Sequence, residues 1–263
     1  MRLSERLGHD HAIVRALRPL HTHWLRARYA HDGVPWEVNG EPIRIDPDAR
    51  HLVPRRSEVP LFEFLRHGIQ PGAVVLDIGS FLGVYAMMAA RWAGPSGRVI
   101  AFEPSPSSFT ILARHLRMNG LEARVDARHA AVGAQAGRTR LVVFEHEPYR
   151  NMIAPVDPAA ASIDVDLVTV DQVCASMVRR PTWIRMDVQG LEFDVLRGAR
   201  DLLRHARGQL TIVAEMHPEQ WVALGIEVRE VDGILAGMGL RARCLPGQND
   251  RYAQSSHAIL DLV

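Results

Sequence analysis

The chain has 263 residues, of which 47% are hydrophobic and 23% charged. This is enough to bury the core of one α/β domain behind an N-terminal extension. The formal net charge of +1 gives no reason for a polyanionic partner, so we expect no nucleic-acid substrate. All 31 basic residues are arginine, which excludes lysine-base, Schiff-base and Walker-lysine mechanisms. No apolar leader or membrane-length run is evident, so we expect a cytoplasmic protein without membrane contacts.

Residues 1–58 are predicted to form an extension, and residues 59–263 the main domain. The pattern from Leu3 to Arg28 is helical, but Pro19 is expected to break or kink it, giving one helix or two. Trp36 to Ile45 alternates around Asn39-Gly40, which predicts a β-hairpin. We expect this extension to act as a cap that contacts the substrate or a second copy in a homodimer. A helix over Val59 to His67 then opens the domain.

The run from Ala73 to Leu76 predicts a strand that is buried on both faces of a parallel sheet, with Asp77 at its carboxyl end. Gly79 and Gly83 allow a tight turn and a close approach to a ligand before a helix over Tyr85 to Trp92. A second strand over Arg98 to Phe102 leads to Glu103, where an acid can accept hydrogen bonds from ribose hydroxyls.

The charge at the end of the first strand separates two kinds of nucleoside cofactor. A nicotinamide dinucleotide places its pyrophosphate over the turn, and the Asp77 carboxylate would repel it. S-adenosylmethionine has no phosphate and carries a cationic amino group and a sulfonium. The sequence therefore favours S-adenosylmethionine over NAD.

After this region, a helix is predicted over Ser108 to Met118 and the third strand over Glu122 to Val132. An insertion follows, with strands over Arg140 to Phe144 and Val165 to Val170. These strands are joined by a long segment from Glu147 to Ala161, of a length typical of lids and binding loops. Within it, Tyr149, Arg150 and Asn151 are either substrate contacts or ordinary exposed residues.

The fourth strand, Thr182 to Met186, is predicted to end at Asp187, and the fifth, Leu210 to Ala214, at Glu215. Both acids therefore belong to the same rim of the sheet as Asp77 and Glu103. The remaining predicted elements are helices over Pro218 to Leu224 and Glu230 to Gly237 and strands over Leu240 to Leu245 and Ser256 to Leu262, the last strand antiparallel.

One longer sequence pattern indicates a particular protein family more specifically than the turn after the first strand does. The stretch Arg185-Met186-Asp187-Val188-Gln189-Gly190-Leu191-Glu192, then Val195-Leu196-Arg197-Gly198-Ala199, resembles the K-I-D-V-E-G-x-E-x-x-V-L-x-G-A signature of FkbM S-adenosylmethionine-dependent methyltransferases. Further matches occur in family order: Asp77 to Gly83, Phe102-Glu103-Pro104, Ala130-Ala131-Val132-Gly133 with Gly137, Val168-Thr169-Val170-Asp171, and Glu215-Met216-His217. Arg185 replaces the usual lysine, and Gln189 replaces a glutamate, which puts any role for an acid there in doubt.

The resemblance implies an α/β, Rossmann-like class I fold with a seven-stranded, mostly parallel sheet and helices on both faces. The pattern and the resemblance together give these cofactor-binding candidates: Asp77, Gly79, Ser80, Phe81, Gly83, Glu103, Pro104, Ala130, Ala131 and Asp187. The two alanines would wall the adenine, although plain core alanines explain them nearly as well. Phe81 and Tyr85 are ligand contacts or core residues.

Three residues are the catalytic candidates: Asp187, Glu215 and His217. Asp187 has three roles open to it, as a general base or acceptor-orienting group, as a metal ligand, or as an N-cap of the following helix. Glu215 and His217 alternate along the chain and so face one side. With Asp187 they would suit Mg²⁺ or Mn²⁺; alternatively His217 is a general base oriented by Glu215, or merely precedes a helix. Glu192 is either a pocket acid or a solvated helix residue.

These inferences predict a methyltransferase of natural product biosynthesis that acts on a hydroxyl of a small metabolite, such as a sugar, polyketide or peptide. The N/D-P-P-Y/F motif of many enzymes that methylate bases or amides is replaced by Met186-Asp187-Val188-Gln189, which disfavours N-methylation. Two alternatives remain. One is a nucleotide-dependent oxidoreductase, and the other is a catalytically silent module that binds S-adenosylmethionine, for which Gln189 is the hint.

Overall fold

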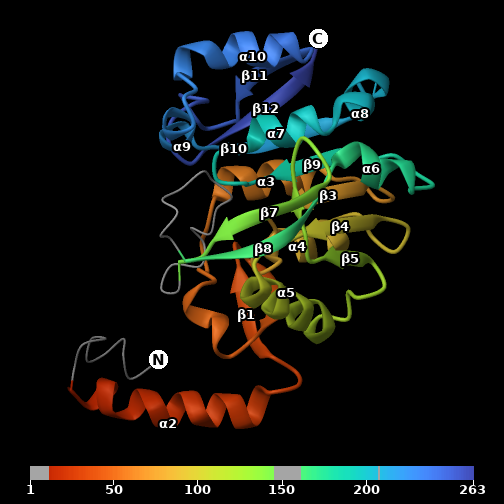
Figure 1. Cartoon of the computed structure of the whole chain (residues 1–263). Helices are drawn as coiled ribbons and strands as arrows, with labels where there is room; N and C mark the ends of the chain where they lie inside the picture. The colour runs from red at the N-terminus through yellow and green to blue at the C-terminus, as the bar shows by residue number, and fades with distance from the viewer. Residues whose placement is uncertain (1–11, 145–160, 207) are drawn as a thin grey trace.

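A seven-stranded sheet organises the molecule (Figure 1). The computed structural model describes residues 12–144, 161–206 and 208–263. The strands of this sheet are β3 (Val74–Ile78), β4 (Arg98–Phe102), β5 (Val125–Arg128), β9 (Trp183–Met186), β10 (Thr211–Met216), β11 (Leu240–Cys244) and β12 (Ser256–Leu262). They lie in the order β11-β12-β10-β9-β3-β4-β5. Every pairing is parallel except the two that β12 makes.

This order confirms the predicted α/β fold with its antiparallel last strand. The chain builds outward from β3 through β4 to β5, then returns to the other side of β3 with β9. The order of strands thus reverses between β3 and β9, and ligands of open α/β sheets bind beyond the carboxyl ends at such a point. The fold therefore places Asp77, on β3, and Asp187, just after β9, at the expected binding edge.

Alternating side chains of the central strands bury both faces of the sheet. On β3, Val75 packs into one hydrophobic cluster while Val74, Leu76 and Ile78 pack into another. The first cluster is covered by α3 (Val59–Gly68), α4 (Val84–Trp92) and α5 (Pro106–Met118). The second is covered by α6 (Val170–Ala175), α7 (Glu192–Arg197), α8 (Arg200–His205), α9 (Pro218–Ala223) and α10 (Val231–Gly237). Burial on both sides explains why β3 is apolar at nearly every position.

The predicted hairpin is confirmed as β1 (Val34–Val38) and β2 (Glu41–Ile45). Its turn residues Asn39 and Gly40 both have positive φ, 50° and 89°, as a two-residue hairpin turn requires. Val38, Ile43 and Ile45 are buried in the same cluster as α3 and α4. The hairpin therefore packs into the core of the main domain.

The N-terminal helix α2 (Ala12–Tyr29) lies at the edge of the molecule, away from the sheet (Figure 1). Arg26 connects it to Asp48 through bonds of 2.8 and 3.0 Å. Of the two outcomes expected at Pro19, the structure has the single helix, because α2 runs through that residue. Proline removes one backbone donor, and a helix of 18 residues retains its other bonds. Residues 1–11 lie outside the described chain.

The insertion forms a separate small sheet of β6 (Ala131–Val132), β7 (Gly137–Val142) and β8 (Ser162–Val168), in the order β6-β8-β7. The predicted single strand from Glu122 to Val132 is therefore wrong. The chain leaves the large sheet at Arg128, and Ala131 pairs with Leu167 instead. Both pieces are short, four and two residues, so periodicity alone could not separate their partners. The Glu147–Ala161 segment falls almost wholly outside the described residues, as do Tyr149, Arg150 and Asn151. Within the described residues, no helix is both long and apolar enough to cross a bilayer.

Candidate active site

Four acids meet at the carboxyl edge of the large sheet, as the sequence predicts. Asp77 lies on β3 and Glu215 on β10, while Glu103 and Asp187 directly follow β4 and β9. These four strands are consecutive in the sheet, with β9 between β3 and β10. The edge therefore concentrates carboxyl groups where a cation or a hydrogen-bond donor would bind.

Asp77 is paired with an arginine rather than exposed. Arg185 is its register partner on β9, and its Nη1 lies 3.4 Å from Asp77 Oδ1 and donates to the Gly79 carbonyl at 2.9 Å. Burial raises the pKa of Asp77, although the charge of Arg185 opposes this. Asp77 Oδ2 and Arg185 Nε are buried without a hydrogen-bond partner among the described residues. One acceptor and one donor are thus left unsatisfied side by side.

The turn after β3 is shaped by close packing as much as by its glycines. Gly79 has a φ of +77°, and a Cβ there would lie 1.8 Å from the Asp187 carbonyl oxygen. Ser80 Oγ donates to the Asp77 carbonyl at 2.8 Å. Phe81, also at positive φ (49°), donates its backbone N–H to Glu103 Oε2 at 2.8 Å. The turn is therefore held between the ends of β4 and β9, and Gly83 begins α4 at a φ of +79°.

Glu103 fixes the neighbouring loops. Its two carboxylate oxygens accept the backbone N–H groups of Phe81 and Ser105, both at 2.8 Å. Burial raises the pKa of Glu103 to about 8, although the two backbone hydrogen bonds act against the rise. The Pro104 carbonyl lies 3.0 Å from His129 Nε2. Each Glu103 oxygen keeps a second lone pair, which a ribose hydroxyl can use.

The two candidate adenine-wall residues lie at the start of the small sheet. Ala131 is in β6 and packs in a cluster with Leu141 and Val165. Ala130 is 7% exposed and directly precedes that strand. The structure thus places Ala131 in the core of the small sheet and Ala130 between the two sheets.

His217 and Glu192 form a buried pair behind the rim. His217 Nδ1 lies 2.7 Å from Glu192 Oε1, and both residues are 1% exposed. Glu192 also accepts the Trp221 indole N–H at 2.6 Å and the Gly190 N–H at 3.0 Å. Burial alone would lower the pKa of His217, but the bond to Glu192 and the charges of Glu192, Asp187 and Glu215 raise it to about 9. Glu192 is therefore a buried partner of His217 and not a solvated helix residue.

Gln189 connects this pair to the rim. Its Nε2 donates to Asp187 Oδ1 at 2.9 Å and lies 3.0 Å from His217 Nε2. Arg185 Nη2 reaches the other Asp187 oxygen at 3.2 Å. No side-chain capping bond is made at the start of α7, whose N-cap is Leu191. Asp187 therefore belongs to the rim network and is not a helix cap.

Asp187, Glu215 and His217 also meet the distance requirement of a metal site, with one ligand atom from each lying within 4.8 Å of the others. Glu215 Oε1 and Asp187 Oδ1 are each 3.6 Å from His217 Nε2. However, the Gln189 amide nitrogen lies within hydrogen-bond distance of two of these three ligands. Burial, with the charge of Asp187, raises the pKa of Glu215 to about 8. A metal at these three residues stays a prediction.

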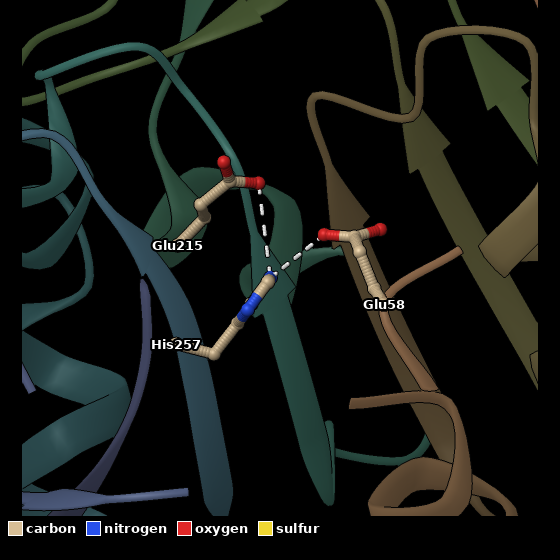
Figure 2. Close-up of side chains that lie close together, drawn as sticks. All are labelled: Glu58, Glu215 and His257. Carbon is tan, nitrogen blue, oxygen red and sulfur yellow. Dashed lines mark ion pairs between the residues drawn. The ribbon is translucent and has the colours of Figure 1, made fainter. Parts of the chain in front are cut away.

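The structure adds two polar residues that the sequence did not single out. Glu58, at the N-cap of α3, accepts a hydrogen bond from Tyr85 Oη at 2.9 Å. His257 Nε2 lies 3.0 Å from Glu58 Oε1 and 3.7 Å from Glu215 Oε2 (Figure 2). The sequence predicted a strand around His257. It did not predict that His257 lies opposite Glu215, because that depends on the register between β10 and β12.

A cavity of about 140 Å³ lies against this network. Polar groups of Glu58, Tyr85, Arg185 and Asp187 contribute to its wall, with the 79–82 turn. Its apolar wall comes from Val38, Leu52, Val53, Pro54 and Val84. Ligand pockets usually measure roughly 300–1,000 Å³, so this cavity would hold only part of a cofactor or an acceptor. It joins the turn after β3 to the segment that follows the hairpin.

The chain is similar to known methyltransferases. The family described as "Methyltransferase FkbM domain" matches residues 77–241, more than half of the chain. Methyltransferase sdnD of Sordaria araneosa is 22% identical over 209 residues, covering 66% of this chain and 78% of that protein. Methyltransferase 1 of Beauveria bassiana is 24% identical over 147 residues. That alignment covers 48% of this chain and spans 58% of the relative.

Two solved structures also align. An O-methyltransferase from Bacillus cereus is 15% identical, covers 82% of this chain and 86% of its own, and has a TM-score of 0.48. A precorrin-6y C5,15-methyltransferase from Geobacter metallireducens is 12% identical, with coverages of 80% and 89% and a TM-score of 0.47. The family match begins at Asp77 and includes the turn after β3, Glu103, Asp187 and His217. The chain therefore belongs to the FkbM family of S-adenosylmethionine-dependent methyltransferases.

Proposed function

We propose that the protein transfers the methyl group of S-adenosylmethionine to a hydroxyl oxygen of a small metabolite. The observation that carries this proposal is the position of Asp187. Its side chain is 22% exposed, the residue lines the cavity, and its backbone carbonyl lies against the turn after β3. A carboxylate at this place can accept the proton of an alcohol as the oxygen attacks a methyl group.

The donors and acceptors of β3 and β9 fit the amino-acid part of the cofactor. Asp77 Oδ2 is an acceptor without a donor and Arg185 Nε a donor without an acceptor within the described chain. An α-amino acid offers the complementary ammonium and carboxylate. Glu103 supports the ribose through its remaining lone pairs. When bound, S-adenosylmethionine supplies an electrophilic methyl group on a sulfonium.

The residues around Asp187 hold it for this role. Arg185 binds one oxygen and the Gln189 amide the other. The buried Glu192–His217 pair lies behind the amide and fixes its position. We therefore assign Asp187 as the group that contacts the acceptor, and Gln189, His217 and Glu192 as positioning residues. The pKa of His217 is raised to about 9, so the imidazole is protonated near neutral pH. It becomes a general base only if it loses that proton and the Gln189 side chain moves away from Nε2.

The cavity wall supports an acceptor with a polar group on an apolar body. Glu58, Asp187 and the Tyr85 phenol can hydrogen-bond to hydroxyls, while Leu52 and Val53 provide apolar contact. Sugars and polyketide or peptide natural products combine hydroxyl groups with apolar parts in this way. The absence of an N/D-P-P-Y/F sequence after β9, where Asp187 stands instead, also favours oxygen over nitrogen as the methylated atom.

The test is activity with a labelled methyl donor against a panel of hydroxylated and aminated metabolites. We expect label in O-methyl products, and exclusive label on nitrogen would contradict the assignment. Calorimetric titration with NAD(H) and S-adenosylmethionine separates the oxidoreductase alternative, since only the latter should bind. Tight binding of S-adenosylmethionine with no labelled product from any metabolite extract would instead support a catalytically silent module.

A further inference from the structure

A second group of metal-ligating side chains lies on the other side of Glu215. Glu215 and His257 are register partners on the antiparallel strands β10 and β12. Directly opposite residues of such a pair project from the same face of the sheet. Glu58 reaches them from the N-cap of α3, so two carboxylates and one imidazole point toward one another (Figure 2).

The imidazole of this group is buried with its Nε2 facing two carboxylates. His257 is 4% exposed, and its Nε2 makes no hydrogen bond of acceptable geometry with any described residue, although it faces both carboxylates. A buried polar atom normally has a partner, because leaving it unsatisfied costs about 1–3 kcal/mol. The nitrogen is thus aimed at a position where a ligand would satisfy it.

The separations suit a shared ion. Two atoms that each lie about 2.1 Å from one ion can be at most about 4.2 Å apart. His257 Nε2 lies 3.0 Å from Glu58 Oε1 and 3.7 Å from Glu215 Oε2, both within this limit. One ligand atom from each of the three residues lies within 4.8 Å of the others, so only the separation of the two carboxylates can exceed the limit. We propose that Glu58, Glu215 and His257 bind a divalent first-row cation of the Mn²⁺ or Zn²⁺ class. A mixed set of carboxylates and imidazole suits these ions better than Mg²⁺ or Ca²⁺.

The surroundings orient the ligands. The Tyr85 hydroxyl donates to Glu58 Oε2, which leaves Oε1, the oxygen nearer to His257, for the ion. Such outer hydrogen bonds are the usual support of metal-binding carboxylates. The neighbouring group of Asp187, Glu215 and His217 differs, because there the Gln189 amide already lies beside two of the ligands. The Glu58 group is therefore the better cation site of the two.

A cation here would join three parts of the chain. It would connect the start of α3 to β10 and β12 and hold Glu58 in the wall of the cavity. Binding of the ion does not depend on the identity of the methyl acceptor. If the protein does not methylate hydroxyls, the proposed metal site can therefore still exist. If no metal binds, hydroxyl methylation can still occur.

The test is metal binding by the full chain after removal of metals with EDTA and dialysis. Mn²⁺ is titrated with detection of the free ion by electron paramagnetic resonance, and Zn²⁺ by calorimetry. We expect saturable binding of one ion and a higher midpoint of thermal unfolding in its presence. Glu58→Gln and His257→Gln should each weaken the affinity by more than about ten-fold.

Two further variants make the result specific. Glu63→Gln, on the exposed side of the same helix, should bind as the unchanged protein does. Asp187→Asn should also retain the ion, whereas loss of binding in this variant would assign the ion to the other group and overturn the proposal. Equal affinity in Glu58→Gln, or no saturation by either metal up to about 1 mM, would overturn it as well. If His257→Gln does not fold, as circular dichroism will show, Glu58→Gln alone decides.

Discussion

Asp77 has a structural place in the fold and, in the proposed function, a place in cofactor binding. Arg185 on the next strand offsets part of its charge at 3.4 Å, which makes burial of the carboxylate tolerable. The second oxygen has no partner within the described residues. A ligand ammonium would therefore complete a pair that the protein alone leaves incomplete.

Replacing Asp77 by asparagine should weaken S-adenosylmethionine binding by roughly ten- to a hundred-fold, because a charged hydrogen bond contributes about 1.5–3 kcal/mol. Calorimetry measures the change. 5′-Methylthioadenosine, which lacks the amino-acid part, should bind both proteins alike. Asp126→Asn, at a half-buried ion pair with Arg128, is the matched control. Equal loss for both ligands would show that Asp77 serves the fold and not the ammonium.

Asp187→Asn should lower kcat by about 10²-fold or more, as expected for loss of a proton acceptor, while the Kd for S-adenosylmethionine stays within a few-fold. His217→Asn and Glu192→Gln should lower kcat less, since both act through Gln189 and Asp187. Asp194→Asn, an exposed acid on α7, should leave turnover unchanged. Full activity of Asp187→Asn would remove this residue from the chemistry.

At the level of residues, the sequence located the acids that directly end strands. Asp77, Glu103, Asp187 and Glu215 were predictable because parallel strands end at one edge. Glu58 was not, because it lies in a connection before α3 and reaches the site only through tertiary packing. His257 required the register between β10 and β12, and a shift by one residue would have turned it to the opposite face.

Among the elements, the turn between β3 and α4 is the most tightly constrained. Gly79 combines a positive φ with contact to the backbone after β9. The rim acids thus depend on a turn that admits no side chain at position 79.

Gly79→Ala should destabilise the protein by several kcal/mol or prevent folding, because a Cβ would overlap the Asp187 carbonyl oxygen. Gly94→Ala provides the comparison. Gly94 also has a positive φ, +67°, but open space around its Cβ position, so the cost should be only about 1–2 kcal/mol. Urea unfolding of both variants measures the difference, and similar values would mean that the turn adjusts to the added methyl group.

Most strands of the large sheet, and the helices α9 and α10, lie close to their predicted bounds, whereas no bounds were predicted for α6, α7 and α8. Arg98–Phe102 and Ser256–Leu262 have the predicted bounds, since apolar strands between turn residues give a clear pattern. α6, α7 and α8 have six residues each, too few for a helical period to show. α9 is equally short, but Pro218 marks its start. The separation of β5 from β6 could not be predicted, because it depends on which strand each one pairs with.

For the molecule as a whole, the buried acids of the rim make stability depend on pH. The pKa of Glu103 rises from 4.5 to about 8 on folding because of burial. Between these values the folded protein holds a proton that the unfolded chain has lost. The free energy of unfolding should therefore fall as the pH rises from about 4.5 to about 8.

Urea unfolding between pH 5 and 8 tests this expectation, with a slope of at most ~1.4 kcal/mol per pH unit for each such group. Glu103→Gln should reduce the dependence of the free energy of unfolding on pH but not remove it, since the pKa of Glu215 is raised to about 8 as well. Glu63→Gln, at the surface of α3, should follow the unchanged protein. Stability that increases with pH over this window would contradict the burial of these acids as neutral groups.

The position of β12 has a consequence for the order in which the molecule assembles. This strand follows β11 along the chain but lies between β11 and β10 in the sheet. During synthesis, β10 and β11 emerge first and cannot be bridged until residues 256–262 have left the ribosome. His257, which faces Glu215 and Glu58, is also the last of the rim residues to appear. The large sheet and the Glu58 group are thus completed in a single late step, and a nascent chain that stops before Ser256 would have neither.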